Sequence, residues 1–203
     1  SITQGSSWNE IVYKGPFTGV FDGAGYTIAN LTCEFAGSDI EAAFIHHNRG
    51  TIRNVVLKIN QLYAKAERVA ALCAENYGTI DNCYITWYTR SGYHYATDIN
   101  TDVCSLDMER YPFVGGVCAY NAGTITRCTV ESLHIKVYQG LAGGICAYND
   151  ESGVITDCVV NNLKAVFCFN PEDNEFKGYE IAPITCINLG DVKNCTYTNF
   201  MSY

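Results

Sequence analysis

The stretch "GVCAYNAGTITRC" at residues 116–128 decides the fold, because the chain repeats it, with small changes, as "GICAYNDESGVITDC" at residues 144–158. A unit of two short β segments around an Asn-x-Gly turn cannot bury its apolar side alone, whereas stacked copies can. Further copies align on the same asparagine or, in the last case, on the second half of the unit: "FIHHNRGTIRNVV" (44–56), "LCAENYGTIDNCY" (72–84), "ITCINLGDVKNCT" (184–196) and "FTGVFDGAGYTIANL" (17–31).

Two columns of apolar residues, three positions apart, predict the shape of the unit. Residues three apart cannot share a face of a straight strand, so the chain must turn a corner between them. We therefore expect an all-β, right-handed parallel β-helix of about six coils, a single domain over 1–203 with an N-terminal cap at 1–24 and stacked coils at 25–203. The columns are Ile52, Ile80, Ile125, Ile155 and Val192, and Val55, Cys83, Cys128, Cys158 and Cys195.

The turn between the two β segments has its own pattern. Stacked asparagine amides are expected to hydrogen-bond along it, and its glycines are expected to adopt positive φ. The asparagines are Asn48, Asn76, Asn121, Asn149 and Asn188, and the glycines are Gly50, Gly78, Gly123, Gly153 and Gly190.

The repeat "VGGVCAYNAGTITRC" resembles the bacterial GLUG-motif repeat, which reads roughly Gly-Gly-Leu-Val-Gly-x-Asn-x-Gly-x-Ile-x-Asn-Cys. The segment "FTGVFDGAGYTIANL" is similar to the one that commonly precedes the first such repeat, and the resemblance covers about residues 16–200. It implies a right-handed parallel β-helix in an adhesin-like bacterial protein, extracellular or at the cell surface. Because the first residue is Ser and not Met, we expect the chain to be a processed form or a fragment of a longer protein. The chain departs from the pattern with Cys at 73, 118 and 146 and Ala at 74, 119 and 147.

Seven of the eleven cysteines occupy two inward repeat positions, where other coils place Ile, Val or Thr. A free cysteine behaves there as a small buried hydrophobe. We expect a ladder of reduced thiols rather than a disulfide framework or a zinc site, since C-x-x-C is absent from the sequence. Cys104 and Cys168 lie off the columns in two insertions and can pair; the redox state of these two, and of Cys33 and Cys186, is left open.

Composition narrows the possible partners. The net charge of −8 repels phosphate backbones, so no nucleic-acid partner is expected. No apolar run reaches the length of a membrane span, and no sequence motif suggests a cofactor or a metal. The adjacent His46 and His47 are expected to point to opposite faces of a strand and to be structural or surface residues.

Two insertions, near 87–111 and 168–180, enter at the same point of two coils and add 17 and 9 residues. Insertions at one repeat position project from one side, which in repeat proteins is often the binding side. Aromatic rings beside carboxylates suit a glycan or a protein surface; alternatively, the loops fold over the sheet and only cover it. The candidate ligand-binding residues are Trp87, Tyr88, Tyr93, His94, Tyr95, Glu172, Asp173 and Glu175.

The sequence thus favours a non-enzymatic, secreted or cell-surface module that binds a glycan or a protein through the insertion side. An alternative is a β-helix carbohydrate-active enzyme, in which Asp173 or Glu175 would face Asp98 or Asp102 as an acid/base pair. A passive stalk segment is a third reading.

Overall fold

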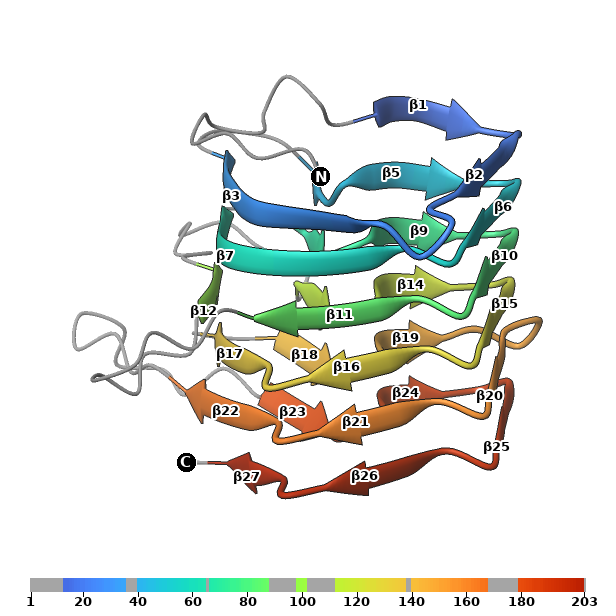
Figure 1. The fold of residues 1–203 in the computed structure, drawn as a ribbon. Helices are drawn as coiled ribbons and strands as arrows, with labels where there is room; N and C mark the ends of the chain where they lie inside the picture. Colours follow the sequence, from blue (N-terminus) through green and yellow to red (C-terminus); the bar gives the residue numbers. More distant parts are fainter. Residues whose placement is uncertain are drawn as a thin grey trace.

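The computed structural model describes residues 13–35, 40–64, 66–87, 98–101, 112–137, 140–167 and 179–202. These residues form short β-strands that wind as stacked coils (Figure 1), and the part of the chain described contains no helix. All strand pairs are parallel, and two of the sheets hold six strands each. The predicted parallel β-helix of six coils is therefore confirmed.

Each coil contributes strands to separate sheets, and we name each sheet by one of its strands. The β9 sheet and the β10 sheet each contain one strand per coil. In stacking order the β9 sheet contains β1 (Tyr13–Phe17), β5 (Ile45–Asn48), β9 (Cys73–Asn76), β14 (Cys118–Asn121), β19 (Cys146–Asn149) and β24 (Thr185–Asn188). The β10 sheet contains β2 (Val20–Asp22), β6 (Thr51–Arg53), β10 (Thr79–Asp81), β15 (Thr124–Thr126), β20 (Val154–Thr156) and β25 (Asp191–Lys193).

Two further sheets complete the coil. The β8 sheet contains β4 (Glu41–Ala42), β8 (Arg68–Ala70), β13 (Phe113–Gly115), β18 (Gly140–Gly143) and β23 (Tyr179–Ala182). The β7 sheet, the largest, contains β3 (Thr27–Phe35), β7 (Val56–Ala64), β11 (Tyr84–Trp87), β12 (Asp98–Thr101), β16 (Thr129–Glu131), β17 (His134–Val137), β21 (Val159–Asn161), β22 (Lys164–Phe167), β26 (Thr196–Thr198) and β27 (Met201–Ser202).

The register of the sheets reproduces the columns of the sequence repeat. Ile80 on β10 pairs with Ile52 on β6 and with Ile125 on β15, and all three side chains are fully buried. Cys118 on β14 pairs in the same way with Cys73 and Cys146. Apolar side chains of successive coils therefore stack on one another and fill a continuous interior.

The asparagine ladder is present as predicted. Each amide Nδ2 donates to Oδ1 of the asparagine on the next coil, at 2.8 Å from Asn48 to Asn76, 2.8 Å from Asn76 to Asn121, 2.7 Å from Asn121 to Asn149 and 2.8 Å from Asn149 to Asn188. A side-chain amide has both a donor and an acceptor, so identical residues satisfy one another in a column.

The prediction of positive φ for the turn glycines was wrong. Positive φ occurs instead at residues such as Asn54 and Asn82, at the corner just before the inward column of Val55 and Cys83. The glycines are required for a different reason, which Gly78 illustrates: a Cβ there would collide with the backbone carbonyl of Gly50 on the preceding coil.

The ladder cysteines are free and lie inside the β-helix. Six of them are buried, whereas Cys195 on the last coil is half-buried. Burial raises the pKa of the Cys118 thiol well above its ordinary value, which disfavours the reactive thiolate. Cys104 and Cys168 lie outside the described residues.

Some residues of the predicted cap and of the first insertion form strands of the stacked sheets. Tyr13–Phe17 and Val20–Asp22 pair with β5 and β6, so the described part of the predicted cap already belongs to the first coil. The larger insertion is interrupted by β12 (Asp98–Thr101), which pairs with β7 and β17 and returns the chain to the β7 sheet.

Candidate functional site

In each coil from the second onward, a strand of the β8 sheet is followed by a strand of the β9 sheet, and the two sheets meet at a corner of the β-helix. Its floor consists of small side chains, because Ala43, Ala70, Ala74 and Ala119 form a buried cluster separate from the main core, against which Phe113 packs. Short floor residues allow the longer side chains on the two flanking strands to reach one another. We call this region the corner.

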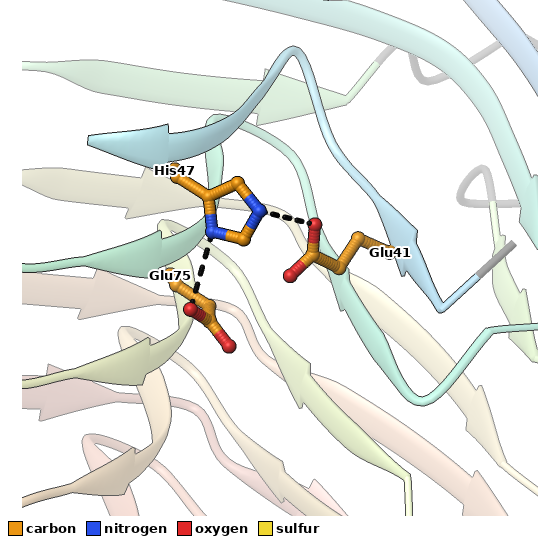
Figure 2. A group of neighbouring side chains, drawn as sticks. All are labelled: Glu41, His47 and Glu75. Atoms are coloured by element: carbon orange, nitrogen blue, oxygen red, sulfur yellow. Dashed lines mark hydrogen bonds and ion pairs between the residues drawn. The ribbon is translucent and has the colours of Figure 1, made fainter. Parts of the chain in front are cut away.

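A cluster of charged residues occupies the end of the corner formed by the second and third coils (Figure 2). Oε2 of Glu41, on β4, lies 3.0 Å from Nε2 of His47, on β5. The same oxygen lies 3.3 Å from Nδ1 of His46. The second ring nitrogen of His47, Nδ1, lies 3.2 Å from Oε2 of Glu75, on β9. His47 thus stands between carboxylates that come from two different sheets.

The expectation that His46 and His47 point to opposite faces was wrong, because both side chains contact the same oxygen of Glu41. The reason lies in the residues on either side of them. Ile45 belongs to the apolar core and the Asn48 amide to the buried ladder. Since these two residues, three apart, both point inward, the strand turns between them and presents both histidines to the corner.

Arg68, on β8, lies beside the Oε1 atoms of both carboxylates. Its Nε lies 3.0 Å from Oε1 of Glu75, and its Nη1 lies 4.0 Å from Oε1 of Glu41. Both glutamates are only 9% exposed. Their charges therefore stand in surroundings where water screens them weakly, and a partner charge is needed to hold them there.

The pKa of Glu41 reflects these neighbours. Burial by itself raises the pKa of this carboxyl group, but the hydrogen bond with His46 and the positive charges of His47 and Arg68 lower it by more, so the pKa lies below its ordinary value. Glu41 is therefore ionised at neutral pH. A buried anion of this kind can bind a cation, orient a polar ligand or take part in proton transfer.

An aromatic row continues the corner along the axis of the β-helix. Tyr120 stacks on Tyr148 with ring centroids 5.5 Å apart, and Tyr148 stacks on Phe113 at the same distance. Tyr77 extends the row toward the charged cluster, where its hydroxyl donates to Oε2 of Glu75 at 2.9 Å. Because the stacked rings cover one another's faces, edges and hydroxyls are what the row offers to a ligand.

The structure places one of the predicted ligand-binding residues in the core. Trp87 is 4% exposed and belongs to the apolar cluster, so its indole offers no open face for stacking. It is the last residue of β11 and pairs with Ile59 of β7. The other candidates lie outside the described residues: Tyr88, Tyr93, His94, Tyr95, Glu172, Asp173 and Glu175.

The two insertions nevertheless connect to strands of the corner. Residues 102–111 lead into β13, which carries Phe113, and residues 168–178 lead into β23, which carries Glu180. These strands lie two places apart in the β8 sheet. The insertions therefore join the fold on the same side, at strands that form one wall of the corner.

Comparison with protein-family models, with characterised proteins and with solved structures found no match for this chain. The resemblance to GLUG-motif repeats therefore stays a prediction. Within the described part of the chain there is no helix with the length and apolar character needed to span a bilayer.

Proposed function

We propose that this protein is a non-enzymatic binding module, secreted or displayed at the cell surface, and that it binds a glycan along the corner. The observation that carries the proposal is the aromatic row, which ends in a cluster of carboxylates, imidazoles and a guanidinium group. Sugars present many hydroxyl groups, which the tyrosine hydroxyls, carboxylates and imidazoles of the corner can engage by hydrogen bonds beside the aromatic edges.

The spacing of the site supports an elongated ligand. The row and the charged cluster occupy successive coils, which lie about 4.8 Å apart in a parallel stack. A chain of two to three sugar units spans the same length. Since each strand of the β8 and β9 sheets pairs in parallel with at least one neighbouring coil, the contact groups are fixed before the ligand arrives, which reduces the entropy cost of binding.

The experiment is a glycan-array screen with the purified protein, followed by calorimetry on the best ligand. Tyr148→Ala and Tyr120→Ala should each weaken binding by about fivefold, since an aromatic contact contributes roughly 1 kcal/mol. Tyr84→Ala is the matched control, because Tyr84 is an exposed tyrosine on the β7 sheet. Tyr95→Ala tests the insertion. Loss of binding in Tyr95→Ala with full binding in both corner variants would move the site to the insertion.

A polysaccharide-cleaving activity is the second candidate, favoured by the convergence of Glu41 and Glu75. Their ligand oxygens lie within 4.8 Å of each other, and retaining glycosidases use two carboxyl groups about 5 Å apart. A reducing-end assay over a polysaccharide panel tests this activity. Turnover that Glu41→Gln and Glu75→Gln both abolish, with binding retained, would favour the enzyme over the binding module.

A further inference from the structure

Both ring nitrogens of His47 face carboxylate oxygens, one from each of the two glutamates. A neutral imidazole has one N–H group and one nitrogen with a lone pair. Here both nitrogens face carboxylate oxygens, at 3.0 Å for Nε2 and 3.2 Å for Nδ1. With a neutral ring, one lone pair would face an anionic oxygen. A metal ion beside the ring would accept that lone pair and attract both carboxylates, whose ligand atoms lie close to the ring.

The ligand atoms are close enough to share one ion. One ligand atom from each of Glu41, His47 and Glu75 lies within 4.8 Å of the other two. Atoms bound to a tetrahedral zinc ion at bond lengths near 2 Å lie roughly 3.3 Å apart, so modest side-chain rotations bring the three atoms into a coordination shell. Their backbones, on β4, β5 and β9, are fixed by pairing with adjacent coils, which preorganises the set.

We propose that Glu41, His47 and Glu75 form a binding site for a divalent transition-metal ion, with zinc as the representative ion. One imidazole nitrogen and two carboxylate oxygens suit zinc, manganese, iron or cobalt, whereas calcium and magnesium prefer oxygen alone. The His47 side chain is 32% exposed, so the ion reaches the site from solvent and water completes its coordination.

His46 and Arg68 contact the carboxylates of this set and can orient them toward a metal ion. Nδ1 of His46 lies 3.3 Å from Oε2 of Glu41, and Nε of Arg68 lies 3.0 Å from Oε1 of Glu75. Such contacts orient the carboxylates and hold them in one rotamer. Arg68 contacts the Oε1 atoms, which leaves the Oε2 atoms directed at the place where His47 stands. This inference is independent of glycan binding, because it concerns the charged cluster alone.

The test is metal binding by the purified full chain after dialysis against a chelator. Zinc content by mass spectrometry and cobalt absorption spectra give the stoichiometry and the ligand type. We expect one ion per chain, visible cobalt bands of a nitrogen–oxygen shell, and at least tenfold weaker binding in each of Glu41→Gln, His47→Gln and Glu75→Gln. Glu180→Gln is the matched control, because Glu180 lies in the same column of the β8 sheet on the last coil and should bind as the parent does.

Three results would overturn the metal site. They are an absence of stoichiometric binding to the parent chain, unchanged affinity in His47→Gln, and intense near-ultraviolet sulfur-to-cobalt bands, which would assign the ion to the thiols. Circular dichroism melts of the three variants separate lost ligands from lost fold. If His47→Gln does not fold, the near-isosteric Glu75→Gln variant decides, because it removes one ligand charge and keeps the side-chain shape.

Discussion

Replacing Asn121 by Ala tests how much the amide ladder stabilises the stack. Asn121 is completely buried. It donates to Asn149 at 2.7 Å and to the Gly123 carbonyl at 3.2 Å, and it accepts from Asn76 at 2.8 Å and from the Gly123 amide at 3.3 Å. Each hydrogen bond contributes about 1 kcal/mol, and each buried group left unpaired costs about 1–3 kcal/mol. Since Asn76 retains other acceptors, the expected loss is about 3–5 kcal/mol.

The assay is urea unfolding followed by circular dichroism, with the slope against urea used to check that the same surface unfolds. Asn188→Ala is the matched control. Asn188 ends the ladder on an exposed turn, where it accepts one amide bond at 2.8 Å and water can replace what is lost. We expect a loss of about 1 kcal/mol there. Equal losses in the two variants would refute the argument that burial within the ladder sets the energy.

Variants at three further positions probe the fold. Trp87→Ala should destabilise the chain by about 3–5 kcal/mol in urea unfolding, because it empties a core site. Trp87→Phe should cost much less, since the indole N–H has no partner among the described residues. Similar losses in the two variants would contradict this. Gly78→Ala should cost about 1–3 kcal/mol, because its Cβ meets the Gly50 carbonyl, and a neutral effect would show that the coils can separate. Hydrogen bonds, first from Asn54, lower the pKa of Asp22 in the folded chain. The stability that ionised Asp22 contributes is therefore present above the ordinary pKa of Asp and is lost as the pH falls through its folded-state pKa. The difference in stability between the parent and Asp22→Asn should shrink between about pH 5 and pH 2, and a constant difference would argue against this reasoning.

The interior of the β-helix could be predicted because every coil repeats it. Ile52, Ile80 and Ile125 recur at one repeat position, and stacking requires that position to be apolar in every coil. The insertions interrupt the repeat. The repeat therefore predicts where each insertion begins, but it does not predict that Asp98–Thr101 forms a strand of the β7 sheet. Trp87 was misplaced for the same reason: it looks like the start of an insertion, whereas it ends a strand whose side chains alternate into the core.

The charged cluster could have been found in part. His47 and Glu75 share one repeat position, so the alignment alone puts them side by side on adjacent coils. Ile45 and Asn48 are three residues apart and both occupy inward repeat positions. The argument that the chain must turn between two such residues would have placed both histidines on the outside. Glu41 was out of reach, because its column holds a different kind of residue in most coils (Arg68, Phe113, Leu141 and Glu180) and only the folded β8 sheet shows its position.

In-register stacking explains why opposite charges alternate in the corner. Amides and aromatic rings stack well on copies of themselves, so the same residue can recur at the Asn121 position or, as tyrosine, in the row. Carboxylates repel their copies at a coil spacing of about 4.8 Å. In the β8 sheet Glu41 therefore pairs with Arg68, and in the β9 sheet His47 pairs with Glu75. The two columns run in opposite order, which brings His47 against both glutamates. Two buried carboxylates thus stand on either side of one imidazole, and a divalent cation can be shared by all three groups because their ligand atoms lie within 4.8 Å of one another.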